Sequence, residues 1–165
     1  MGTSGLLAVL FGGLGLLIAR YIHGVIMSYP EGEEKLRRIA EQIQLGASVF
    51  MQREYKLLTV FLIVVFFAIL LSGLGWQTAL SFIVGALCSG TAGYIGMHTA
   101  TRANVRTTTA AHTRGQADAL TVAFFGGSVM GLAVASLGLL GVGLLYFLFG
   151  AAPHPAHAMH GFGSS

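Results

Sequence analysis

The residues that could bind a metal ion are few, and the most regular group lies near the C-terminus. His154, His157 and His160 recur at every third position. A helix would place them on one side, and imidazoles bind zinc and copper. The prolines on either side of His154 disfavour that helix, and no carboxylate or thiol is near enough to complete the site. We therefore interpret residues 151–165 as a flexible His- and Gly-rich tail, with a metal site as the less favoured alternative.

Acidic residues are too few for an active site that binds a metal–phosphate complex. The chain has one aspartate, Asp118, and its glutamates all lie within residues 31–54. A site that holds divalent metal ions needs several oxygen ligands in one place. The sequence also lacks a glycine-rich phosphate-binding loop, and its single cysteine, Cys88, allows no internal disulfide. We therefore predict no catalytic, substrate-binding or metal-binding residue in this chain.

The elements that must position these residues are membrane-spanning helices. The 165 residues are 55% hydrophobic and 9% charged, whereas a soluble domain has about 25% charged residues. Four apolar stretches cover about residues 3–27, 57–76, 78–99 and 119–150, and each is long enough to cross about 30 Å of hydrocarbon as a helix. The sequence therefore predicts an all-α fold, a polytopic bundle of four transmembrane helices in a single region, residues 1–150. The fourth stretch is long enough to be tilted, kinked or extended beyond the lipid.

The basic residues lie on one side of these spans. All nine Lys and Arg residues lie in or beside two loops, about residues 28–56 and 100–118. The positive-inside rule places both loops in the cytoplasm and both ends of the chain outside. The net positive charge therefore reflects membrane topology, and we expect a lipid bilayer rather than nucleic acid as the partner.

The first loop contains a predicted cytoplasmic amphipathic helix. Pro30 and the acidic residues after it are typical of a helix start. Apolar residues then recur at spacings of three, four and seven, which indicates one apolar helix face: Leu36, Ile39, Ile43 and Phe50. This helix lies at the membrane interface or leads into the second span, or, as the less favoured alternative, it binds another part of the protein.

Small residues in the third and fourth spans predict tight helix packing. Small residues four positions apart let helix backbones approach closely in lipid, and those concerned include Gly90, Gly93, Gly96, Gly127 and Gly131. A groove that lines a conduction path is the less favoured alternative. Arg20, His23 and His98 lie near span ends, and the middles of the second and fourth spans hold no ionisable residue, so the sequence shows no obvious proton or cation relay.

Three motifs carry a resemblance to a known family. Residues 46–55 read GASVFMQREY, residues 88–107 read CSGTAGYIGMHTATRANVRT, and residues 123–131 read AFFGGSVMG. In order and spacing they resemble the N-terminal quarter of the ion-translocating membrane pyrophosphatases, over about residues 20–150. The resemblance implies an all-helical enzyme that works as a homodimer. Such an enzyme hydrolyses pyrophosphate on the cytoplasmic side with magnesium and drives protons or sodium ions outward.

The resemblance also implies a supporting role for this chain. In the family, acidic motifs in later helices bind magnesium pyrophosphate, and this sequence contains none of them. We therefore expect an N-terminal fragment of a pyrophosphate-energised pump in a bacterial inner membrane. It is expected to be inactive by itself and to supply outer helices that support the remaining helices of the pump. The alternatives are a standalone four-span scaffold or assembly protein and, less favoured, a small oligomeric transporter.

Seven residues match the motifs of the family: Gly46, Arg53, Glu54, Tyr55, Arg102, Asn104 and Arg106. The resemblance leads us to expect that the charged and polar ones brace the cytoplasmic ends of the helices. The alternative, of equal weight, is that Arg53 and Arg106 only mark the cytoplasmic side. The choice between protons and sodium ions, and any dependence on potassium, is set in the family by residues beyond this chain.

Overall fold

The computed structural model describes residues 2–149, which form four long helices. These are α1 (Gly2–Ser28), α2 (Glu34–Leu71), α3 (Trp76–Thr113) and α4 (Gln116–Phe149). All four are long and apolar enough to cross a bilayer. The predicted all-α membrane bundle with four spanning helices is therefore confirmed for the described part of the chain.

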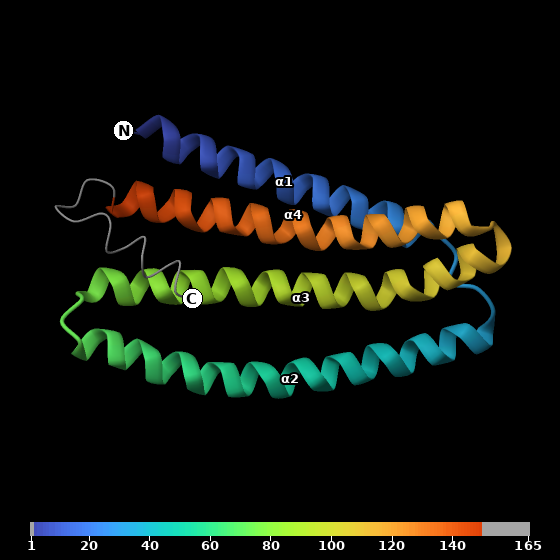
Figure 1. The fold of residues 1–165 in the computed structure, drawn as a ribbon, viewed down its shortest axis with the longest axis horizontal. Coiled ribbons are helices and arrows are strands. Elements are labelled where there is room, and N and C mark those ends of the chain that lie inside the picture. Colours follow the sequence, from blue (N-terminus) through green and yellow to red (C-terminus); the bar gives the residue numbers. More distant parts are fainter. Residues whose placement is uncertain (1, 150–165) are drawn as a thin grey trace.

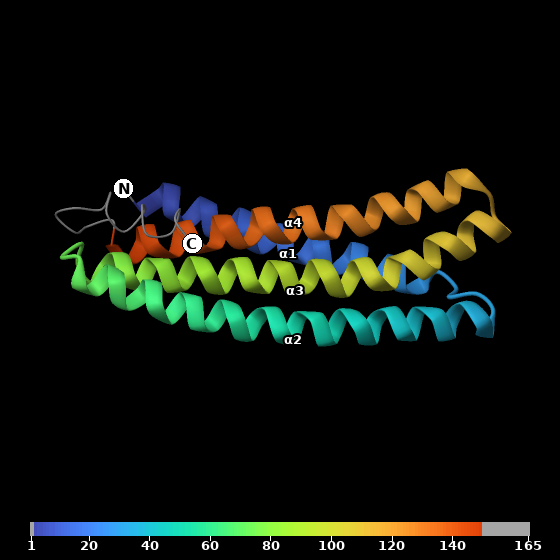
Figure 2. The same ribbon diagram turned by 60° about the horizontal axis from the view of Figure 1, so that its bottom comes forward.

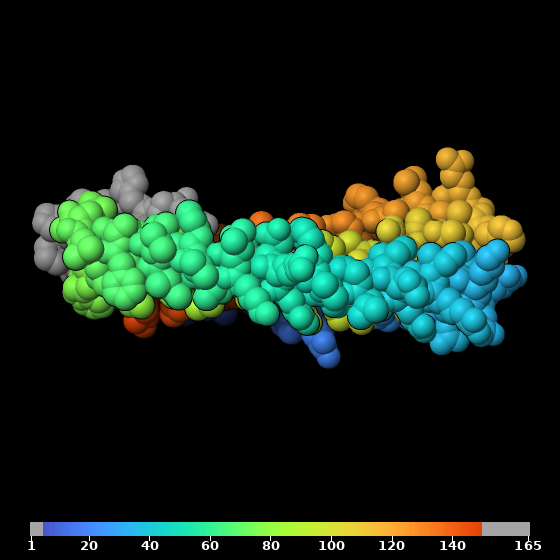
Figure 3. Space-filling view, turned by 90° about the horizontal axis from the view of Figure 1, so that it is seen from below, coloured from blue at the N-terminus to red at the C-terminus, as the bar shows by residue number. Residues whose placement is uncertain are grey.

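In the view of Figure 1 the helices follow one another in the order α1, α4, α3, α2, and α4 lies between α1 and α3. Helix α4 packs against both α1 and α3, whereas α2 contacts only α3. Turning the bundle keeps α2 at the outer edge beside α3 (Figure 2). From below, α2 covers this edge along the whole length of the molecule (Figure 3). Ala40 is its only buried residue. The apolar part of α2, residues 57–71, therefore presents an exposed apolar surface that suits lipid or further helices.

The charged segments that we expected as loops are mostly helical. Helix α2 begins at Glu34 and continues without a break into the apolar span, and α3 continues to Thr113. The amphipathic helix is therefore the first part of α2, and of the alternatives given above the structure shows the one in which it leads into the second span. The physical reason is composition: residues 34–56 are rich in Glu, Lys, Arg, Gln and Leu, which favour helix, and contain no proline. The true links are residues 29–33, 72–75 and 114–115.

A two-residue turn joins α3 to α4. Gly115 has a φ of +96°, a left-handed conformation that glycine adopts without steric cost. Its N–H and that of Arg114 both donate to the Ala110 carbonyl, at 3.0 and 2.8 Å. These bonds satisfy a carbonyl that the helix end would leave without a partner. The sharp turn returns the chain directly along α3, which gives α4 its place beside α3.

Glycines allow the closest helix contact, between α1 and α4. A Cβ atom at Gly12 would lie 2.8 Å from the Ser136 carbonyl oxygen and 2.7 Å from Leu140 Cγ. A Cβ atom at Gly143 would lie 3.1 Å from Ala8 Cβ. The two backbones therefore approach as small-residue helix pairs do in membranes.

The glycines singled out in the sequence have different surroundings. A Cβ atom at Gly96 would lie 2.8 Å from Met130 Cγ, and one at Gly93 would lie 3.6 Å from the Tyr55 hydroxyl. At Gly90, Gly127 and Gly131 a Cβ atom would meet no atom of the described residues within 4 Å. For these three, packing against another helix stays a prediction.

Candidate functional site

Arg106 lies at the centre of a hydrogen-bond network at the charged end of the bundle. Its side chain is 7% exposed. Its Nε donates to the Tyr29 carbonyl (3.1 Å), its Nη1 to the Arg102 carbonyl (2.9 Å) and its Nη2 to Glu31 Oε1 (2.8 Å). A guanidinium group offers donors in a fixed planar fork, so one side chain can hold three acceptors at once. Arg106 therefore ties the link between α1 and α2 to α3.

Two further contacts hold the same link. The Thr109 hydroxyl donates to the Glu31 carbonyl (2.9 Å), and Arg37 Nε lies 3.5 Å from Glu31 Oε2. Glu31 is 40% exposed, so solvent weakens the ion pairs, but the hydrogen bonds fix the path of the backbone. The network joins the end of α1, the start of α2 and the end of α3.

Tyr55 joins α2 to α3 nearer the middle of the bundle. Its hydroxyl donates to the Gly90 carbonyl at 2.6 Å. Helix α2 contacts no other helix. The bond from Tyr55 therefore helps to fix the position of α2 along α3.

We expect Tyr55→Phe to lower the free energy of unfolding by about 1 kcal/mol, the usual net contribution of one hydrogen bond. Tyr94→Phe is the control, because the Tyr94 hydroxyl makes no hydrogen bond among the described residues. The measurement is an SDS titration of the purified protein in mixed micelles. Equal midpoints for the two variants would show that the Tyr55 hydroxyl does not stabilise the helix pair.

The remaining motif residues make fewer contacts. Arg53 is exposed and makes no hydrogen bond or ion pair among residues 2–149. Glu54 is half-buried, and Gly46 and Asn104 are exposed. Arg102 donates from Nη1 to His98 Nδ1 (2.9 Å). The structure thus brings Arg102 and Arg106 into one network on α3 and leaves Arg53 outside it.

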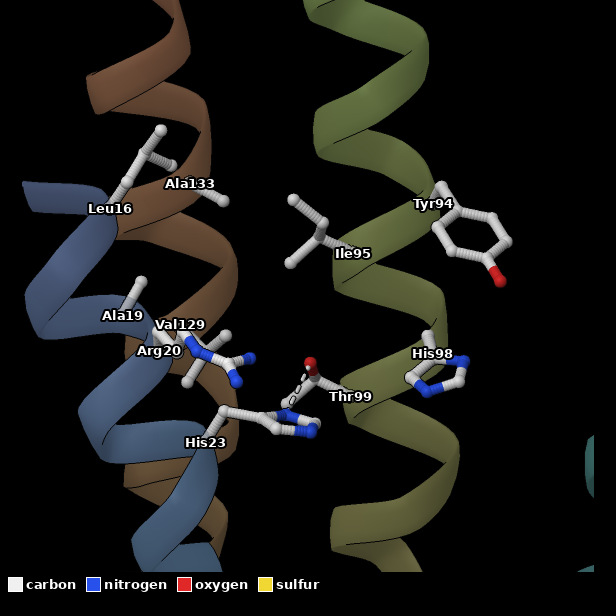
Figure 4. Close-up of a pocket in the computed structure, with 10 residues that line it drawn as sticks. All are labelled: Leu16, Ala19, Arg20, His23, Tyr94, Ile95, His98, Thr99, Val129 and Ala133. Atoms are coloured by element: carbon white, nitrogen blue, oxygen red, sulfur yellow. Dashed lines mark hydrogen bonds between the residues drawn. The ribbon is translucent and has the colours of Figure 1, made fainter. Parts of the chain in front are cut away.

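Sequence reasoning missed a polar cluster between α1 and α3. His23 Nδ1 lies 3.2 Å from Thr99 Oγ1, and the rings of His23 and His98 are 6.3 Å apart. Arg20 projects from α1 into the same space (Figure 4). The only signal in the sequence was that Arg20, His23 and His98 all lie near the charged ends of their spans. Which helices face each other is decided by the fold.

Comparison with known proteins identifies the family. A sequence model of the family described as inorganic H+ pyrophosphatase matches residues 13–165. The chain belongs to this family. The motif residues Arg53, Tyr55 and Arg106 all lie inside the matched region.

Related proteins support the assignment to the inorganic H+ pyrophosphatase family. A putative K+-stimulated pyrophosphate-energized sodium pump of Clostridium tetani is 46% identical over 87% of this chain. The K+-insensitive pyrophosphate-energized proton pump 2 of Moorella thermoacetica is 40% identical over 92%. The K+-stimulated pyrophosphate-energized sodium pump of Thermotoga maritima is 42% identical over 83%. The matches cover 21%, 23% and 19% of those relatives, so this chain spans about a fifth of their length.

Magnesium, which the family resemblance implies, does not fit the described residues. No group of three or more His, Cys, Asp or Glu side chains that could hold a metal ion occurs among residues 2–149. Glu31 is already engaged by Arg37 and Arg106, and Asp118 stands at the start of α4. His154, His157 and His160 lie outside the described residues.

Proposed function

We infer that this chain works as part of a membrane pump that couples pyrophosphate hydrolysis to outward movement of protons or sodium ions. The observation that carries this inference is the family match over residues 13–165. The relatives named as pyrophosphate-energized pumps are about five times longer than the matched segment. The inference therefore concerns these helices as one part of a larger pump, which works as a homodimer.

Within the pump, these helices support the active site and do not form it. Metal-bound pyrophosphate requires several oxygen ligands in one place, and the chain has six acidic residues in all. The specific contacts described above have a structural role: Arg106 and Thr109 join α3 to the link between α1 and α2, and Tyr55 joins α2 to α3. Magnesium and pyrophosphate would therefore be bound by other helices of the pump.

The charged end of the bundle faces the cytoplasm in this proposal. Helix ends that carry Lys and Arg stay on the cytoplasmic side of a membrane. Seven of the nine such residues lie toward the links at residues 29–33 and 114–115, and the other two, Arg53 and Lys56, lie near the middle of α2. The start of α1 and the end of α4 lie together at the other end (Figure 1). We place this opposite end outside the cytoplasmic membrane of a bacterium.

The proposal is tested with an antibody raised against residues 31–56, used on native membranes. We expect it to recognise a polypeptide several times heavier than 17.3 kDa and to deplete magnesium-dependent pyrophosphate hydrolysis from the solubilised membranes. Pre-immune serum is the control. A single band near 17.3 kDa with undiminished hydrolysis would instead favour a standalone four-span scaffold or assembly protein.

A further inference from the structure

A groove runs between α1 and α3, with α4 as its floor. It has a volume of about 280 Å³. Val129 and Ala133 of α4 form the floor, and Ala19 of α1 lies beside them. These three residues are 0–4% exposed, so the floor is firmly packed. The groove exists because α1 and α3 both pack on α4 and scarcely touch each other.

The groove is polar at one end and apolar at the other. Arg20 and His23 line the polar end from α1, and Thr99 and His98 line it from α3 (Figure 4). Leu16 and Ile95, about one to two helical turns away, line the apolar end with the floor residues. A ligand that fills this groove therefore needs a polar group joined to an apolar chain.

The polar end carries a positive charge that α1, α3 and α4, the helices that line the groove, do not balance. Glu41 of α2 lies with His98 along a neighbouring groove between α2 and α3. Helices α1 and α3 contain no acidic residue, and α4 contains only Asp118, near its start. Arg20 has no hydrogen bond or ion pair among residues 2–149. An arginine close to the hydrocarbon region requires an anion or the headgroup layer to offset its charge.

His98 adds a hydrogen-bond donor. Arg102 donates to His98 Nδ1, and a guanidinium group can only donate. Nδ1 of His98 is therefore the acceptor, so the hydrogen of the neutral ring lies on Nε2, which is free to donate to an anion. Tyr94 stacks on the same ring, with centroids 5.7 Å apart, and this contact holds the ring in place.

The polar end also lies at headgroup depth. Trp76 begins α3 at the end opposite the charged links, and tryptophan is enriched at membrane interfaces. His98 follows 22 residues later, which is about 33 Å along the helix, close to the thickness of the hydrocarbon core. Arg20 lies about 27 Å from the start of α1 by the same measure. The groove therefore opens at the headgroups and continues into the hydrocarbon.

We propose that this groove binds one anionic phospholipid of the cytoplasmic leaflet. The lipid phosphate accepts hydrogen bonds from Arg20, His23 and His98, and one acyl chain lies along Leu16, Ile95 and the floor formed by α4. Charge complementarity favours a lipid phosphate over an apolar helix, because a helix would leave Arg20 without an anion.

The test compares Arg20→Gln with Arg53→Gln in the intact protein, purified from membranes in mild detergent. Arg53 is equally exposed to solvent but lines none of the grooves near His98. Native mass spectrometry measures binding of added phosphatidylglycerol and phosphatidylcholine. We expect Arg20→Gln to weaken phosphatidylglycerol binding about tenfold, as the loss of one charge-assisted contact predicts, and Arg53→Gln to leave it unchanged. Equal effects of the two substitutions, or equal binding of the two lipids, would overturn the proposal.

A second measurement identifies what fills the groove. A photoreactive benzophenone side chain at the position of Leu16 is activated in native membranes. Cross-linking to phospholipid is the expected result. Cross-linking to another segment of protein would show that a helix covers the groove, and the lipid site would then be rejected. This result does not depend on pyrophosphate hydrolysis, so it is separate from the test of the proposed function.

Discussion

Replacing Arg106 by glutamine is expected to lower the free energy of unfolding by about 3 kcal/mol, the low end of the range for breaking a buried ion pair. The low end applies because Glu31 is 40% exposed, although Arg106 itself is buried. Glutamine is too short to reach the carbonyls of Tyr29 and Arg102 together with the Glu31 carboxylate. The link between α1 and α2 would therefore separate from α3.

The measurement is an SDS titration together with limited trypsin digestion, which cuts after Lys35 and Arg37 when the link opens. Arg53→Gln is the matched control, because Arg53 is exposed and outside the network, and surface substitutions change stability by about 0.5 kcal/mol or less. Arg106→Lys should give an intermediate loss, since lysine keeps the charge but not the planar fork. If Arg53→Gln and Arg106→Gln behave alike, both arginines act only as markers of the cytoplasmic side.

Replacing Gly12 by valine is expected to separate α1 from α4 and to cost about 3 kcal/mol, the upper part of the range for overpacking. The added Cβ would lie 2.8 Å from the Ser136 carbonyl oxygen. A side chain can rotate away from such a contact, but a helical carbonyl moves only with its helix. The whole of α1 would therefore have to shift.

Gly13→Val provides the control for this experiment. Gly13 is the next residue on α1, yet a Cβ atom there would meet no atom of the described residues within 4 Å. Both substitutions carry the same cost in helix propensity, so their difference isolates the contact with α4. Similar unfolding midpoints in SDS would mean that α1 and α4 do not pack as closely as the structure shows.

The two predictions concern the two ways in which these helices hold together. At the charged end, Arg106 and Thr109 bind the backbone of a link, which is a polar contact outside the apolar stretches. Within the spans, Gly12 and Gly143 allow close backbone contact without polar groups. Both kinds of contact would hold these helices in register in the supporting role proposed above.

The spans could be predicted from the sequence because the bilayer imposes a simple requirement. A stretch of about 20 apolar residues has no alternative to helix in lipid, where each backbone group needs a partner within the segment. The helix ends could not be predicted so well. Arg53 and Lys56 end the apolar pattern of the second span but do not end the helix, since charged residues with long side chains favour helix in water too.

The packing surfaces of the helices show most clearly what could not be predicted from the sequence. The sequence determined that the chain has four apolar helices long enough to cross a membrane and that most of its basic residues lie toward one end of them, because both follow from composition along the chain. Only the tertiary structure decided that Gly12 faces a neighbour while Gly131 meets none among residues 2–149, and that Arg106 is buried while Arg53 is exposed. The physical reason is that the sequence does not show which face of each helix meets another helix. That is decided by the packing of α4 against α1 and α3, and of α2 against α3.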